Sequence, residues 1–149
     1  MDFGRSTALH VEEHVSEVGR LVAWQVSPQV WVSKAQGRMQ LGHAEAWMRL
    51  GDRMVATGLP FAGFHDWTEM ESYDSETRRL LTDWSLAHRA QFIEVHLAVR
   101  SRLVRMGVTV ANLALGNFMV THESVDTMEK AFLETLARLR RERSASSAR

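Results

Sequence analysis

Two histidines and a glutamate near the N-terminus have a spacing that can hold zinc for peptide hydrolysis. The segment HVEEH, residues 10–14, fits the pattern H-x-x-E-H. On a helix, His10 and His14 would share one face and bind the metal, with Glu13 beside them as general base. The segment lies in a polar stretch, outside the packed elements that would supply a third ligand. We therefore predict no metal site here.

A second candidate for chemistry is the pair His65 and Asp66, beside Trp67. The pair stands at the end of a predicted central strand, where sites in α/β proteins tend to lie. A His–Asp pair can move protons, but no Ser or Cys nucleophile signature accompanies it, and the chain has no cysteine. We favour histidines satisfied by hydrogen bonds, as also for His88 and His96, and predict that the protein is not an enzyme. A hydrolase using His65 and Asp66 is the weakest alternative.

The third candidate is the segment MESYDSETRR, residues 70–79, which precedes a helical run of apolar residues that starts at Leu80. Asp74 is placed to cap this helix, with its carboxylate accepting from free backbone N–H groups. The next three residues would then form the first turn. Capping a helix would by itself account for the polar residues of this segment, so a purely structural role is an alternative to a functional one. The functional reading is an exposed docking site for a protein partner that carries Arg or Lys, formed by Asp74, Ser75, Glu76, Thr77 and Arg78.

The elements that would position these residues follow the order ββαβαβαβα. Two β-branched and aromatic runs, 21–27 and 30–37, predict a hairpin. Helical periodicity then alternates with short apolar runs, which predicts an α/β fold: a mostly parallel, mixed sheet of about five strands with right-handed crossovers. The further strands are predicted at 61–67, 93–99 and 118–122, and the helices at 42–57, 74–87, 103–116 and 124–139.

Around this domain, assigned to residues 20–140, lie two polar segments. Residues 1–19 are poorly periodic and predict an N-terminal extension with a helical turn after Ser6. Residues 141–149 are basic and low in complexity, which predicts a flexible tail.

Composition removes several classes of function. Lys plus Arg equals Asp plus Glu, at 18 each, so no net charge steers the 149-residue chain toward nucleic acid. The absence of cysteine excludes disulfides and thiolate metal sites. The longest apolar run, VTVANLALGNFMV, is too short to span a membrane, and no secretory signal opens the sequence. We therefore expect a cytoplasmic protein without cofactor.

The element order, the junction HDWTEMESYDSETRRLLTDW and the third-helix segment SRLVRMGVTVANLALG resemble the STAS domain. This is the SpoIIAA-like fold of bacterial anti-sigma-factor antagonists and of sulfate-transporter tails. The resemblance spans about Leu21 to Leu139. The Sec14-like branch of the same superfamily shares the topology and stays open. The first group implies a bacterial regulatory module that binds a protein, and the second implies a carrier that encloses a small apolar ligand.

In the antagonists the loop reads roughly Asp-Ser-Ser/Thr-Gly, and a kinase partner phosphorylates the hydroxyl two positions after Asp. Placed on this sequence, Asp74 starts the pattern, Glu76 takes the phosphoacceptor position and Thr77 takes that of the Gly. A carboxylate is no substrate for a serine kinase, so the resemblance implies no switch at Glu76. A shift of one residue would make Ser75 the phosphosite.

We therefore predict a non-catalytic module that docks a kinase-like or regulatory protein through the loop and N-terminus of the second helix. The apolar third helix, from Val108 to Leu115, is expected to pack on the sheet. Its alternative role is an exposed interface for a partner or a homodimer.

Overall fold

The computed structural model describes residues 2–147 as a six-stranded sheet with four α-helices. The strands are β1 His10–Val15, β2 Gly19–Ser27, β3 Val30–Met39, β4 Phe61–Tyr73, β5 Phe92–Val99 and β6 Val120–His122. The helices are α1 Leu41–Ala56, α2 Ser75–Ala87, α3 Arg102–Ala114 and α4 Val125–Ser147, and two 3₁₀ turns lie at Arg5–Thr7 and Arg89–Gln91. The predicted α/β class and element order are confirmed.

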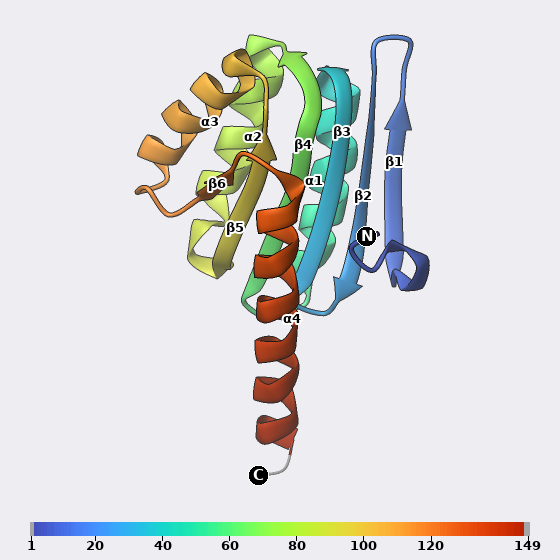
Figure 1. The fold of residues 1–149 in the computed structure, drawn as a ribbon, viewed down its shortest axis with the longest axis vertical. Helices are drawn as coiled ribbons and strands as arrows, with labels where there is room; N and C mark the ends of the chain where they lie inside the picture. Colours follow the sequence, from blue (N-terminus) through green and yellow to red (C-terminus); the bar gives the residue numbers. More distant parts are fainter. Residues whose placement is uncertain (1, 148–149) are drawn as a thin grey trace.

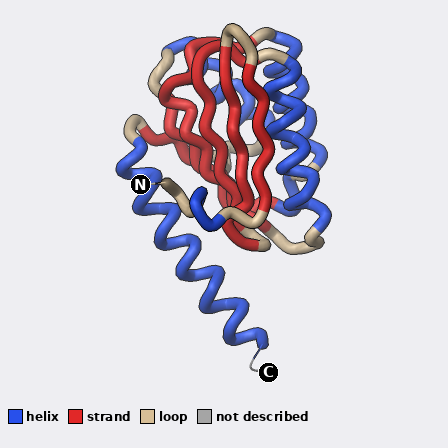
Figure 2. The backbone as a smooth tube through the Cα atoms, turned by 90° about the vertical axis from the view of Figure 1, so that its right-hand side faces the viewer, coloured by secondary structure: helices blue, strands red, loops and turns tan. Residues whose placement is uncertain are grey.

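The strands lie in the sheet in the order in which they occur in the chain. β1, β2 and β3 pair antiparallel, and β3 to β6 pair parallel. Each parallel connection moves one strand further in the same direction, so right-handed crossovers place α1, α2 and α3 on one face. α4 follows the last strand and crosses the opposite face (Figures 1 and 2).

The sheet therefore separates two hydrophobic layers. Alternate residues of β3 enter different layers: Trp31 and Ala35 face α1 and α2, whereas Val30 and Val32 face α4. Buried residues of α4 that complete the second layer are Met128, Phe132, Leu136 and Leu139. This arrangement leaves the site candidates of β4 and α2 on the three-helix face.

The sheet has one strand more than the five that the sequence predicts, because His10–Val15 pairs with β2 within the predicted N-terminal extension. β1 is an edge strand, and its even-numbered residues His10, Glu12 and His14 are polar and half-buried. A strand without an apolar face gives no period-two signal in the sequence. The N-terminal segment also covers the sheet, since Phe3 is buried and its carbonyl accepts from the Trp24 indole at 3.0 Å.

α4 continues beyond the sheet. Its last buried residue is Leu139, and the helix runs on to Ser147, so most of the segment predicted as a flexible tail is helical. This end of the helix projects from the domain in Figures 1 and 2. The last two residues of the predicted tail lie outside the described part of the chain. Within residues 2–147 no helix is long and apolar enough to cross a membrane.

Candidate functional site

Asp74 stands at the N-cap position of α2, as the sequence predicts, but it does not cap the helix. Its side chain accepts no hydrogen bond from the first turn. The carboxylate instead accepts from Arg38, with Nε at 3.0 Å and Nη2 bonded to the same oxygen. Arg38 reaches it because the two strands that carry these residues pair side by side, Met39 with Tyr73. The predicted capping bond is therefore wrong: a charged donor competes successfully with the backbone N–H groups.

The first turn of α2 presents only some of the predicted docking residues. Ser75, Glu76 and Arg78 are exposed, whereas Thr77 is completely buried and its Oγ1 has no hydrogen-bond partner. On a helix the fourth residue returns to the face of the first, so one residue of every turn must face the sheet. Thr77 therefore offers nothing to an approaching protein, and Ser75, Glu76 and Arg78 form the accessible surface.

α3 presents an apolar stripe to solvent. Its inner residues Val104, Gly107 and Val108 are buried, as expected for a helix packed on the sheet. Its outer residues are large, apolar and exposed: Leu103 at 58%, Met106 at 62%, Val110 at 56% and Leu113 at 65%. The spacing of three and four residues places all four on one face. The inner side of the helix therefore packs on the sheet as predicted, and its outer side leaves an apolar surface exposed.

A groove joins the start of α2 to this stripe. It has a volume of about 280 Å³ and is lined by Tyr73, Ser75, Arg78, Leu103, Met106, Gly107 and Val110. Gly107 sets its depth, because a Cβ at this position would lie 1.4 Å from Tyr73 Oη. The absence of a side chain at Gly107 therefore lets the phenol of Tyr73 lie against the backbone of α3.

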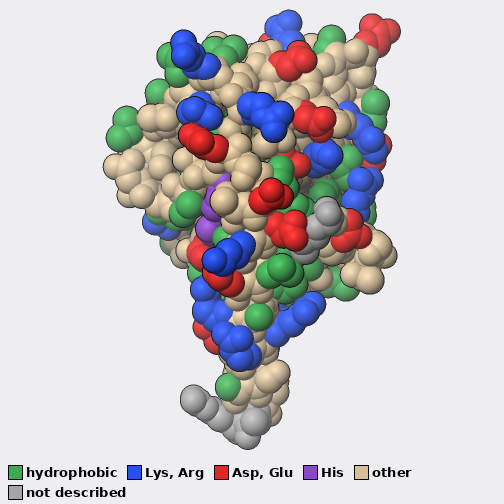
Figure 3. Space-filling view, in the orientation of Figure 1, with side chains coloured by type: hydrophobic (Ala, Val, Ile, Leu, Met, Phe, Trp, Pro, Cys, Tyr) green, Lys and Arg blue, Asp and Glu red, His purple; other side chains and the backbone are tan. Residues whose placement is uncertain are grey.

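The rim of the groove carries more positive than negative charge. Exposed arginines lie on the two helices that border it and just before α3, and Figure 3 shows Lys and Arg side chains interspersed with Asp and Glu over the upper part of the molecule. They are Arg78 and Arg79 on α2, Arg100 before α3, and Arg102 and Arg105 on α3. Of the three carboxylates in residues 70–79, Asp74 is paired with Arg38, whereas Glu71 and Glu76 are exposed. The charge thus favours acidic groups on a partner, in contrast to the basic partner that the sequence suggested.

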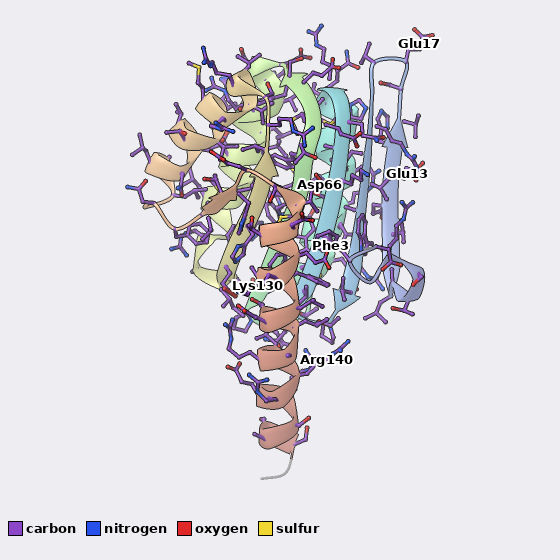
Figure 4. The ribbon with its side chains drawn as sticks, in the orientation of Figure 1. Phe3, Glu13, Glu17, Asp66, Lys130 and Arg140 are labelled. Carbon is purple, nitrogen blue, oxygen red and sulfur yellow. The ribbon has the colours of Figure 1, made fainter. Side chains whose placement is uncertain are left out.

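His65 and Asp66 do not form a catalytic pair. Neighbouring residues of a strand point to opposite faces, and Asp66 lies on the face crossed by α4 (Figure 4), where it accepts from Thr68 Oγ1 at 2.7 Å. His65 is buried on the other face, and burial lowers its pKa to about 3. A histidine with this pKa is a weak base at neutral pH. These observations favour the predicted structural role for His65 over the hydrolase.

The residues of HVEEH also lie apart. Because they form β1 and no helix, His10 and His14 are separated by four extended residues, roughly 13 Å, and Glu13 points to the other face. Glu12 and His10 contact each other, and hydrogen bonding to His10 lowers the pKa of Glu12. The zinc-peptidase geometry, which needs a helix, is absent from this part of the described chain.

His96 belongs to a different hydrogen-bonded cluster, on the α4 face. Its Nδ1 lies 2.9 Å from His122 Nε2, and His122 Nδ1 lies 2.9 Å from Thr127 Oγ1. Burial lowers the pKa of both histidines. The cluster joins β5 and β6 to the start of α4. His88, at the end of α2, lies against Trp84, with the ring centroids 4.7 Å apart and the rings tilted by 51°.

Beneath α2 and α3 the structure also contains a cavity that the sequence did not suggest. It has a volume of about 70 Å³, and its wall is mostly aromatic and aliphatic, with residues from β3, β4, β5 and the three helices. His65, Trp31, Trp47 and Trp67 are among the lining residues. The sequence has five tryptophans, and nothing in their spacing indicates the space between them.

Two solved structures are similar to the chain. An uncharacterized protein of the DUF3478 family from Shewanella loihica, with a SpoIIAA-like fold, has a TM-score of 0.56 at 16% identity, covering 83% of this chain and 92% of the other. An anti-sigma factor antagonist from Mycobacterium paratuberculosis has a TM-score of 0.51 at 16% identity, covering 83% and 94%. No family model and no curated protein matches the sequence. The chain thus has a SpoIIAA-like fold, and the predicted resemblance is confirmed for the fold.

Proposed function

We propose that the protein is a non-catalytic, regulatory interaction module that docks a protein partner along the groove between α2 and α3. The observation that carries this proposal is the stripe of four large apolar side chains on α3, each more than half exposed. Exposed apolar patches bordered by polar residues mark interaction surfaces. The adjoining turn of α2 supplies the polar border through Ser75, Glu76 and Arg78.

The apolar and charged residues of the groove indicate what kind of partner it would bind. Met106 and Val110 offer an apolar surface that a helix can cover with its own apolar face. The arginines around the groove would pair with carboxylates on the same helix, since charge complementarity steers association. A kinase-like or other regulatory protein with an acidic, amphipathic helix fits this description. A second copy of the chain fits less well, because a two-fold interface would bring the same arginines together.

Ser75 is the proposed phosphosite. It is exposed, it lines the groove, and it is the first residue of α2. A phosphate there would add charge at a helix N-terminus and beside Arg78, where it is stabilised, and would change what the groove accepts. Glu76 has no hydroxyl and stays constitutively charged. Phosphopeptide mapping of protein from its native host tests the assignment, and phosphate elsewhere with none on Ser75 contradicts it.

The docking surface is tested with two matched variants. Met106→Glu places a charge in the stripe, whereas Leu133→Glu places one on α4, where Leu133 is 48% exposed. A partner captured from the native host and identified should bind the second variant as it binds the wild type and bind Met106→Glu at least tenfold more weakly. Equal binding by both variants, with both folded by circular dichroism, would exclude the α3 stripe as the docking surface.

The second candidate function, the carrier of a small apolar ligand, is favoured by the cavity beneath α2 and α3. Its volume of about 70 Å³ is below the ~150 Å³ of a cavity that accepts benzene. A lipid chain would enter only if the two helices moved apart. Native mass spectrometry of the purified protein tests this function, because a carrier of lipids retains a ligand of several hundred daltons.

A further inference from the structure

The hydrogen bonds around His65 determine where its proton lies. The Trp67 indole N–H donates to Ser33 Oγ at 3.1 Å, and Ser33 Oγ lies 2.6 Å from His65 Nδ1. The Trp47 indole N–H also donates to His65 Nδ1, at 3.4 Å. An indole nitrogen can only donate, so Nδ1 is the acceptor and the neutral ring carries its proton on Nε2. Ser33 and Trp47 thus both donate to Nδ1 on one side of the ring, and Nε2–H is left as a donor on the other side.

This donor has no acceptor in the protein. Among residues 2–147, no side-chain hydrogen bond involves His65 Nε2 or the indole N–H of Trp31. The other four tryptophans each donate one. Both nitrogens lie close to Gly63, at 2.8 Å and 2.9 Å from the position that a Cβ there would take. Two N–H groups of buried residues thus lie near the same glycine, and both residues line the cavity.

Most of the remaining cavity wall is apolar. It includes Trp47, Phe61, Phe92, Leu97 and Val108, while the polar side chains of Tyr73, Arg78, Thr82 and Ser85 also border it. An N–H donor in such surroundings is costly to leave unpaired, so an acceptor bound there gains more than it would in water. Burial also keeps His65 neutral at physiological pH, so the ring offers a donor without a positive charge. The site therefore suits an uncharged acceptor.

We propose that the cavity beneath α2 and α3 binds a small uncharged carbonyl compound, whose oxygen accepts from His65 Nε2–H and the neighbouring Trp31 N–H. The volume of about 70 Å³ limits the enclosed part of the ligand to fewer atoms than benzene, which occupies a cavity of ~150 Å³. This site adjoins the docking groove, with which it shares Tyr73, Arg78 and Gly107, but the exposed stripe residues Leu103, Met106 and Val110 do not line it.

The test uses acetone and isobutene, which have the same shape but differ in whether they carry an acceptor. Binding to the full chain is followed by the nitrogen–proton NMR signals of the Trp31 indole and the His65 ring. Acetone should shift both signals in a saturable manner, and isobutene should bind at least tenfold more weakly. Equal affinity for the two probes would overturn the donor site and leave only apolar space.

Variants locate the binding. Ala111 lines the cavity and Ala114 is exposed on the same helix, so Ala111→Leu should abolish the acetone shifts and Ala114→Leu should keep them. His65→Phe should remove the preference for acetone over isobutene. If His65→Phe does not fold, the nitrogen–proton NMR signal of His65 Nε2 in the wild-type protein still tests the proposal. A water that stays bound at Nε2 when acetone is added would overturn it. Met106→Glu should bind acetone normally, which separates failure of this site from failure of the docking surface.

Discussion

Three buried or half-buried histidines make the stability of the fold depend on pH. His65, His96 and His122 all have a pKa lowered by burial, and each takes part in a hydrogen bond with another side chain. His65 serves the hydrogen-bonded core of the three-helix face, and the other two join β5 and β6 on the opposite face. Because all three prefer the neutral form, acid acts on both faces of the sheet in the same direction.

Stability should therefore fall as the pH decreases from about 6.5. The unfolded chain gains a proton on each histidine near pH 6.5, whereas folded His65 resists protonation down to about pH 3. The unfolded state then binds more protons, so the free energy of unfolding decreases with acid, by up to about 1.4 kcal/mol per pH unit for one such histidine. Glu94 acts only at lower pH: burial raises its pKa, but hydrogen bonds from Arg138 and Thr135 outweigh this and hold the pKa below the usual value.

Urea denaturation at pH 7.5, 6 and 5 measures this dependence. The His65→Phe variant, which cannot take up a proton at this position, should show a shallower dependence than the wild type. A free energy of unfolding that stays constant or rises between pH 7.5 and pH 5 would contradict the assignment of a neutral, buried His65.

A second prediction at the residue scale compares two helix starts. Ser101 caps α3, since its Oγ accepts from Val104 N at 3.4 Å, whereas Asp74 makes no such bond to α2. Ser101→Ala should cost about 0.5–2 kcal/mol. Asp74→Ala should cost less, about 0.2–1 kcal/mol, because it breaks a largely exposed pair with Arg38. Chemical denaturation measures the free energy of unfolding of both variants. A larger decrease for Asp74→Ala than for Ser101→Ala would contradict the assignment of Ser101 as the stronger cap.

At the scale of elements, α2 is the least embedded helix of the three on its face. Thr77 is its only buried residue, although Trp84 also packs tightly: a Cβ on Gly51 of α1 would lie 2.5 Å from the Trp84 ring. The Trp84 indole also donates to Asp52 at 2.8 Å. α2 thus depends on the close approach of Trp84 to Gly51 of α1, and next to it Tyr73 of β4 makes a similar approach to Gly107 of α3.

Gly107→Ala should destabilise the protein by about 1–3 kcal/mol, because Tyr73 must leave its place against α3. At an ordinary exposed helical position, Gly→Ala increases the free energy of unfolding by up to about 1 kcal/mol. A decrease at Gly107 would therefore indicate a clash between the added methyl group and Tyr73. Combining Gly107→Ala with Tyr73→Ala provides the control, since the added methyl then meets no phenol. Denaturation midpoints of the four proteins give the coupling between the two positions, and a coupling near zero would contradict the close approach.

The same elements show what the sequence can and cannot predict. Periodicity located α1, α3 and β5 because each has one face against a core. It missed β1, whose inward side chains are His10, Glu12 and His14, and it ended β4 at Trp67, although the strand continues to Tyr73. For the candidate site, local sequence identified the start of α2, but Arg38 lies 36 positions earlier in the chain than its partner Asp74. The groove and the cavity likewise depend on residues that only the folded chain brings together.

At the scale of the whole molecule, α4 covers most of the second face of the sheet, and Phe3 of the N-terminal segment completes the layer. The four buried apolar residues of α4 pack over Val22, Trp24, Val30, Val32, Ala62, Phe64 and Ala98 together with Phe3. Beyond Leu139 the helix projects, and Figure 4 shows Arg140 where it leaves the domain. The N-terminal part of the helix, up to Leu139, is thus needed to cover the sheet, whereas the part after Leu139 buries few side chains.

Truncation should separate these halves. A chain that ends at Glu123 exposes the buried aromatic and aliphatic residues of the second face. It should be unfolded or aggregated, because burying these residues contributes at least as much as the ~5–15 kcal/mol net stability of a typical domain. A chain that ends at Glu142 keeps Leu139 and should lose little. Circular dichroism and size-exclusion chromatography distinguish the outcomes, and a monomeric, cooperatively folding chain without α4 would contradict the essential role of the helix.

The sequential order of the strands has a consequence for how the protein is made. Each new strand pairs with the one synthesised just before it, so the sheet can grow from β1 to β6 as the chain leaves the ribosome. The three-helix face closes step by step with it. The other face stays open until α4 has been made, after all six strands. A nascent chain stalled before Val125 would carry an exposed apolar surface, and this is the stage at which a chaperone has most to bind.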